Sequence, residues 1–158
     1  MAVESSLRGK IRRVSIRGFR SLASVDALEL PQLAVLVGAN GSGKSNLIRF
    51  FEMLSYSLKA RNLQDFVLKQ GGGDDQLFFG ARTTPRMEAS IELNTDQGTN
   101  EYSMALAHVA PDTLAFAQEA FRFSGHDRAG SGKWVDLPMP AQESGLPEAA
   151  AGNGQGGG

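Results

Sequence analysis

A glycine-rich octapeptide at residues 38–45 constrains the fold of this chain more than any other feature. Its sequence, Gly-Ala-Asn-Gly-Ser-Gly-Lys-Ser, satisfies the full pattern G-x-x-x-x-G-K-[ST]. The unbroken apolar run at residues 33–37 predicts a buried central strand before it, and apolar residues at helical spacing predict a helix after it. A strand, a glycine loop and a helix in this order predict a P-loop within an α/β fold.

The residues of this loop have distinct expected roles in binding a nucleoside triphosphate. Glycines let the backbone approach phosphates closely, so that successive N–H groups form an anion nest at the start of the helix. Lys44 is the catalytic candidate, expected to contact the β- and γ-phosphates, and the Ser45 hydroxyl is expected to ligate the metal. The sequence therefore predicts ATP and Mg²⁺ as cofactors. The residues expected to hold them are Gly38, Ala39, Asn40, Gly41, Ser42, Gly43, Lys44, Ser45 and Asn46.

Alternating apolar and polar side chains predict strands on both sides of the loop. Residues 11–17 and 23–30 are expected to be extended before it, and residues 87–93 and 101–108 are expected to form antiparallel strands after it. Residues 113–123 fit either a helix or two strand halves that are out of phase, and we favour the strand. The predicted fold is an α/β P-loop NTPase lobe with a mixed sheet, an antiparallel β meander and one long buried helix after the P-loop.

Helical spacing is clearest just after the loop. The apolar residues there surround most of the helix, so we expect it to be largely buried. They are Leu47, Ile48, Phe50, Phe51, Met53, Leu54 and Leu58. A second, short helix is predicted at residues 62–69.

The chain divides into four predicted parts. Residues 1–9 are expected to be a flexible N-terminus, and residues 10–124 to form the lobe that carries the P-loop. Residues 125–140 are expected to form a loop. Residues 141–158 are rich in glycine and alanine, with too little apolar content to offset the entropy of ordering, so this tail is predicted to be disordered.

Composition limits the classes of protein that remain. A chain of 158 residues has room for one compact domain, and its net charge of -1 is unlike that of a basic nucleic-acid binder. The chain has no cysteine, which excludes a disulfide scaffold and thiolate zinc sites and fits a reducing compartment. No apolar run approaches the roughly 18 residues of a membrane span. We therefore expect a cytoplasmic protein without a membrane partner.

Two segments resemble a known family. Ile-Arg-Arg-Val-Ser-Ile-Arg-Gly-Phe-Arg-Ser-Leu at residues 11–22 and the P-loop with its Ser-Asn-Leu continuation resemble the start of RecF/SMC-like ATPases, which are ABC-type heads. The likeness is greatest to predicted bacterial AAA-type ATPases that include the overcoming-lysogenization-defect nucleases. It covers residues 10–123 in layout, and its specific part is the Gly-Phe-Arg-Ser segment and the P-loop.

The resemblance adds expectations beyond the loop. The family's arginine after the phenylalanine lies near bound nucleotide, so Arg20 is a candidate phosphate contact. A family glutamine senses Mg²⁺ and water, and Gln64, Gln70 and Gln76 are the candidates, with no spacing that chooses among them. The resemblance also implies a homodimer formed through the nucleotide face, with DNA as a partner.

Two family motifs are not found in the sequence. No apolar run after Lys44 ends in Asp-Glu, and no Leu-Ser-Gly-Gly-like signature is present. In the family these parts lie in a C-terminal lobe, so the leading hypothesis is the N-terminal lobe of an ATPase that hydrolyses ATP as a dimer, coupled to DNA repair or defence. The alternative is a non-catalytic, nucleotide-dependent interaction module or a hydrolysis-deficient fragment. A small-molecule kinase fits the strands less well, and no Asn-Lys-x-Asp motif supports a GTPase.

Overall fold

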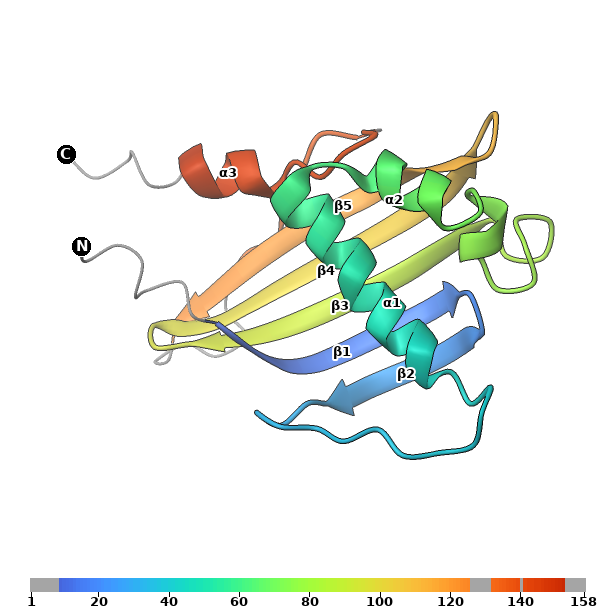
Figure 1. The fold of residues 1–158 in the computed structure, drawn as a ribbon. Helices are drawn as coiled ribbons and strands as arrows, with labels where there is room; N and C mark the ends of the chain where they lie inside the picture. The colour runs from blue at the N-terminus through green and yellow to red at the C-terminus, as the bar shows by residue number, and fades with distance from the viewer. Residues whose placement is uncertain (1–8, 126–131, 140, 153–158) are drawn as a thin grey trace.

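A single antiparallel sheet with helices on one face forms the architecture (Figure 1). The computed structural model describes residues 9–125, 132–139 and 141–152. Its six strands lie in the order β2-β1-β3-β4-β5-β6, and every pairing between neighbours is antiparallel. Residues 1–8 of the predicted flexible N-terminus and residues 153–158 of the predicted tail lie outside the described residues.

The described residues form six strands and five helical elements. The strands are β1 (Lys10–Phe19), β2 (Leu22–Glu29), β3 (Arg86–Thr95), β4 (Gly98–Val109), β5 (Thr113–Gly125) and β6 (Val135–Asp136). The helices are α1 (Lys44–Ser55), the π-helical turn η1 (Tyr56–Ala60), α2 (Leu63–Lys69), the 3₁₀ turn η2 (Asp74–Gln76) and α3 (Leu146–Gly152).

Most strands agree with the periodicity of the sequence, and β5 confirms the phase change predicted for residues 113–123. Ala105 of β4 pairs with Gln118, whereas the next residue, Leu106, pairs with Phe116. Ala117 is therefore an extra residue on β5, as in a β-bulge. The bulge lets Leu106 and Phe116 both be buried although the alternation is broken.

The core lies between the sheet and α1, which crosses one face of the sheet in Figure 1. Phe50 on α1 has no exposed surface, and its ring meets that of Phe19 at a centroid distance of 5.8 Å and an interplanar angle of 73°. Such edge-to-face contacts are favourable because the positive edge of one ring meets the negative face of the other. Val14 and Ile16 of β1 are completely buried in the same cluster. This packing anchors the helix that follows the glycine loop.

The prediction that α1 is largely buried holds for only one of its sides. Leu47 and Met53 are buried against the sheet, but Ile48 is 56% exposed. Phe51 and Leu58 are only partly buried. Among the described residues no second layer covers the side of α1 that faces away from the sheet, so apolar spacing alone overstated its burial.

The predicted central strand at residues 33–37 is wrong for the part of the chain that the structure describes. These residues form no strand, and Leu33, Val35 and Val37 are 83%, 79% and 88% exposed. The predicted mixed sheet is wrong for the same reason, because all described pairings are antiparallel. An apolar run is stable as a central strand only when neighbours pair with both of its edges, and no described strand does so.

The tail predicted to be disordered is ordered over residues 141–152. Ala141 forms a bridge with Phe116, and α3 follows. The carboxylate of Glu119, buried beneath the segment, accepts hydrogen bonds from the Ser144 hydroxyl and from the Gly145 N–H, the latter at 2.9 Å. These polar contacts stabilise a segment that has few apolar side chains, and composition alone could not reveal them.

The carboxylate of Glu119 also accepts a hydrogen bond from a buried tyrosine. The Tyr102 hydroxyl donates to Glu119 at 2.6 Å. Burial raises the pKa of the Tyr102 phenol, and the negative charge of Glu119 raises it further, so the hydroxyl keeps its proton and remains a donor. Glu143 connects this segment to α2. Its carboxylate accepts a hydrogen bond of 2.8 Å from the Leu63 N–H, at the start of that helix.

We predict that Phe50→Ala lowers the free energy of unfolding by about 3–5 kcal/mol, because it leaves a cavity beneath α1. The matched control is Ile48→Ala on the exposed side of the same helix, which should cost less than about 1 kcal/mol. Urea-induced unfolding followed by circular dichroism measures both values. Equal losses in the two variants would contradict this packing of α1.

Candidate nucleotide-binding site

The glycine loop at residues 38–45 surrounds a hollow of about 450 Å³ at the N-terminus of α1. Helix α1 begins at Lys44, so its first backbone N–H groups lie at this hollow and have no partner within the helix. Free N–H donors and the positive end of the helix dipole favour an anion here. The residues that line the hollow are Ser21, Asn40, Gly41, Gly43, Lys44, Ser45 and Asn46.

The Lys44 side chain folds back into the loop. Its ammonium nitrogen lies 2.6 Å from the carbonyl oxygens of both Gly38 and Ala39 and 3.1 Å from the Ser42 hydroxyl oxygen. A lysine ammonium has three N–H donors and no acceptor, so these three contacts use its full capacity. The structure thus places a positive charge inside a ring of backbone and hydroxyl groups.

Two glycines of the loop have backbone angles that favour glycine. Gly41 has φ of 85° and Gly43 has φ of 91°, both in the left-handed region. At Gly43 a Cβ atom would also lie only 2.9 Å from the Leu22 side chain, whereas at Gly41 it would meet nothing within 4 Å. Gly43 is therefore required both for its backbone angle and for the close approach of β2.

We predict that Gly43→Ala damages the loop more than Gly41→Ala does. Both changes strain the backbone, but only the first forces a methyl group against Leu22 at the start of α1. A thermal unfolding series should show the larger loss of stability for Gly43→Ala. Equal losses would mean that the contact with Leu22 does not hold the loop.

The β1–β2 turn completes one wall of the hollow through a residue that the sequence did not single out. Ser21 lines the hollow, and its hydroxyl oxygen accepts a hydrogen bond from the Asn46 side-chain amide at 2.6 Å. Asn46 was expected from the family resemblance, as part of the Ser-Asn-Leu continuation of the P-loop. The only signal for Ser21 was its position in the Gly-Phe-Arg-Ser segment.

Arg20 does not line this hollow. Its guanidinium Nη1 donates to the side-chain oxygen of Gln76 at 3.0 Å. Gln76 is completely buried, so this contact directs the arginine toward the core beside the turn. The predicted phosphate contact of Arg20 therefore stays a prediction that would need a different side-chain orientation.

None of the three candidate glutamines lines the hollow. Gln64 donates to the carbonyl oxygens of Leu114 and Gln142 at 2.8 and 3.2 Å. Gln76 donates to the carbonyl oxygen of Gln70 at 2.9 Å. All three therefore contribute to the packing around α2 and η2 in this structure.

The residues that line the hollow are polar, and their net charge is positive. Among the described residues its lining includes a lysine, two serines and two asparagines, and no carboxylate. In the part of the chain that the structure describes, no group of three or more acidic or histidine side chains could hold a metal ion. Ser45 is exposed at the hollow and could supply one hydroxyl ligand to Mg²⁺. The remaining ligands of such an ion would have to be phosphate oxygens, water or groups outside the described residues.

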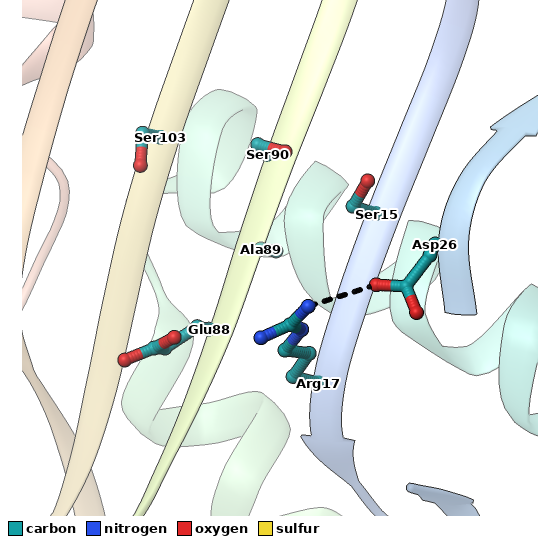
Figure 2. Close-up of a pocket in the computed structure, with 7 residues that line it drawn as sticks. All are labelled: Ser15, Arg17, Asp26, Glu88, Ala89, Ser90 and Ser103. Carbon is teal, nitrogen blue, oxygen red and sulfur yellow. Dashed lines mark hydrogen bonds and ion pairs between the residues drawn. The ribbon is translucent and has the colours of Figure 1, made fainter. Parts of the chain in front are cut away.

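A second hollow, of about 330 Å³, lies on the face of the sheet opposite α1 (Figure 2). Ser15, Ser90 and Ser103 pair in register across β1, β3 and β4 and form its floor. It shares no lining residue with the P-loop hollow. The two hollows are therefore separate features of the molecule.

The charged residues beside the second hollow are paired with one another. Figure 2 shows Arg17 directed at Asp26, and their side chains are 3.1 Å apart. Hydrogen bonds from Ser24 and then from Arg17 hold the pKa of Asp26 below its usual value. Glu88 pairs in turn with Arg86. This surface has the character of a solvated face of an antiparallel sheet.

Comparison with known proteins gives two groups of relatives. The chain is 31% identical over 117 residues to the chromosome partition protein Smc of Mycoplasma genitalium, an alignment that covers 73% of this chain and 11% of that protein. It is 29% identical over 114 residues to the DNA replication and repair protein RecF of Salmonella typhimurium, covering 66% of this chain and 32% of that protein. The chain thus spans a tenth to a third of the length of these relatives.

The sheet, the glycine loop and these relatives define the N-terminal portion of an SMC/RecF-like ABC-type ATPase. More particularly, the chain belongs to the family described as "AAA domain, putative AbiEii toxin, Type IV TA system", whose model matches residues 33–113, just over half of the chain. Nucleotide binding is the property that this membership supports at the level of the family. No helix among the described residues is long and apolar enough to cross a membrane.

Proposed function

We propose that this chain binds ATP together with Mg²⁺ in the P-loop hollow. The observation that carries the proposal is the Lys44 ammonium, which lies inside a glycine loop at the N-terminus of a helix anchored in the core. Lys44 would contact the β- and γ-phosphates, and Ser45 would ligate Mg²⁺. The backbone N–H groups of residues 38–45 would hold the remaining phosphate oxygens.

The strength of these contacts is sufficient for useful affinity. Each charge-assisted hydrogen bond to phosphate contributes roughly 1.5–3 kcal/mol, and the helix terminus adds about 0.3–2 kcal/mol. A dissociation constant near 1 μM requires about 8 kcal/mol. Several such contacts made together therefore reach the micromolar range without any single dominant donor.

We predict that Lys44→Ala weakens binding of a fluorescent ATP analogue at least about tenfold, because the loop loses its only ammonium. The measurement is a titration in the presence of Mg²⁺. Ser45→Ala should weaken binding in Mg²⁺ but change it little in EDTA, since its expected partner is the metal. Phosphate release followed in the same samples is expected to stay near background.

The control for this titration is Lys69→Ala, which removes a lysine paired with Asp65 on α2 and outside the hollow. It should bind the analogue like the unmodified chain. Failure of the folded, unmodified chain to bind the analogue would refute the proposed function. Unchanged affinity in Lys44→Ala would refute the role given to that lysine.

We further propose that the chain acts as the N-terminal lobe of a longer ATPase that hydrolyses ATP as a homodimer across the nucleotide face. The exposed apolar residues Leu33, Val35 and Val37 support this. The backbone N–H and C=O groups of this segment could pair with strands supplied from outside the described residues, which would also cover its apolar side chains. The names of Smc and RecF suggest coupling to DNA in chromosome partition, replication or repair. We propose a cytoplasmic location from the similarity to Smc and RecF.

A second candidate function is nucleotide binding without hydrolysis. It is favoured by the lining of the hollow, which among the described residues contains no carboxylate to hold Mg²⁺ or to position an attacking water. In such a module the bound nucleotide would control docking of a partner. Turnover by the isolated chain would favour the enzyme, whereas the background phosphate release expected above is compatible with both candidates.

The exposed run at residues 33–37 gives a separate prediction about assembly. Val35→Lys should reduce concentration-dependent self-association, because an exposed apolar segment with unpaired backbone groups tends to pair with other chains. Leu68→Lys is the matched control, since Leu68 is 78% exposed but lies on α2. Sedimentation velocity over a range of concentrations measures the effect. A similar reduction in both variants would show that general solubility, and not this segment, controls association.

A further inference from the structure

The β1–β2 turn joins the P-loop hollow to a buried glutamine. Ser21 lines the hollow and is held by Asn46 at 2.6 Å. The preceding residue, Arg20, directs its guanidinium away, to the side-chain oxygen of Gln76 at 3.0 Å. Adjacent residues of one turn therefore contact the candidate nucleotide site and a residue that lies 56 positions further along the chain.

Gln76 is arranged to receive this arginine. It has no exposed surface, and its side-chain nitrogen donates to the carbonyl oxygens of Gln70 at 2.9 Å and Gly72 at 3.0 Å. Because both N–H groups of the amide are used, its orientation is fixed and the oxygen must be the atom that faces Arg20. A buried amide oxygen that loses its donor is destabilised. The pairing of this oxygen thus matters for the stability of the whole loop.

The backbone of the turn depends on the same glutamine. Arg20 has φ of 49°, in the left-handed region that residues other than glycine rarely adopt. Its N–H donates to the Gln76 carbonyl oxygen at 3.0 Å. Phe19 pairs with Leu77, and the Phe78 N–H donates to Gly18 at 3.0 Å. Such strain persists only where the surroundings hold it in place, and it is concentrated at functional sites.

We propose that Gln76 is a positioning residue for Arg20 and makes the site distinguish nucleoside triphosphates from diphosphates; this rests on the proposed nucleotide binding. With a diphosphate, Arg20 stays on the neutral amide of Gln76. With a triphosphate, its guanidinium exchanges that amide for the terminal phosphate. The guanidinium is positively charged in both contacts, but a phosphate also carries negative charge and can accept two parallel N–H bonds, so it attracts the guanidinium more strongly than the neutral amide oxygen does.

The exchange also has a consequence away from the nucleotide. When Arg20 leaves, the buried oxygen of Gln76 loses its donor, so residues 70–76 must adjust or become less stable. The Gly72 N–H, which donates to Val67 at 2.9 Å, reports on this segment. The presence of the terminal phosphate is thereby transmitted from the P-loop to the loop between α2 and β3.

The test compares the ratio of affinities for a non-hydrolysable ATP analogue and for ADP, both with Mg²⁺. We expect Arg20→Ala to lower this ratio on the order of tenfold, through loss of one charge-assisted contact, with little change in ADP affinity. Gln76→Glu should lower it similarly, because a carboxylate retains the guanidinium more strongly than an amide does. In the Arg20→Ala background Gln76→Glu should cause no further decrease. Gln97→Glu, a change at an exposed glutamine in the turn between β3 and β4, should leave the ratio unaltered.

Hydrogen exchange of the unmodified chain is the second measurement, and it does not depend on how well the variants fold. Amides of residues 70–76 should exchange faster with the ATP analogue than with ADP. A ratio unaltered in Arg20→Ala and Gln76→Glu, with binding still dependent on Lys44, would overturn this inference and leave the proposed function standing. Equal exchange with the two nucleotides would overturn it as well. No nucleotide binding by the unmodified chain would overturn both.

Discussion

The packing of α1 against the antiparallel sheet is the interaction on which the rest of the structure depends. Phe50 meets Phe19 in the core, and this contact holds the helix against the sheet and therefore directs its free N–H groups. At Gly43, one residue before α1, a Cβ atom would lie 2.9 Å from the Leu22 side chain of β2. The glycine loop is thus positioned by a helix and a strand that pack independently of any ligand. Its shape is a consequence of the core.

Sequence periodicity predicted the parts of the fold that depend on local pattern. The alternating strands of the meander and even the phase change in β5 could be read from the order of apolar residues, because each strand must bury one face. The failures share a cause. Apolar residues at 33–37 and at Ile48 show what a segment could bury, but not whether a partner is available to cover it. In the tail the opposite happened, since a buried carboxylate at Glu119 orders residues that composition made look unstructured.

In the candidate site, too, the sequence predicted the residues that belong to a local motif and missed the contacts that form only in the folded chain. The glycines and Lys44 were predictable because the motif encodes backbone freedom and charge within eight consecutive residues. The partner of Arg20 was not predictable, because Gln76 lies 56 positions away and no local pattern links them. Ser21 was missed for a related reason: its role comes from the approach of Asn46 to the turn, which is a feature of the folded chain.

Phosphate binding and hydrolysis place different demands on this architecture. The donors that favour an anion are local to the loop and the start of α1, so affinity for a nucleotide follows from a short stretch of chain. Hydrolysis also needs carboxylates, and none of the described residues that line the hollow carries one. The exposed run at residues 33–37 leads directly into Gly38. A strand that pairs with this run would also fix the leading end of the loop, so we expect assembly to strengthen nucleotide binding as well as supply the groups for hydrolysis.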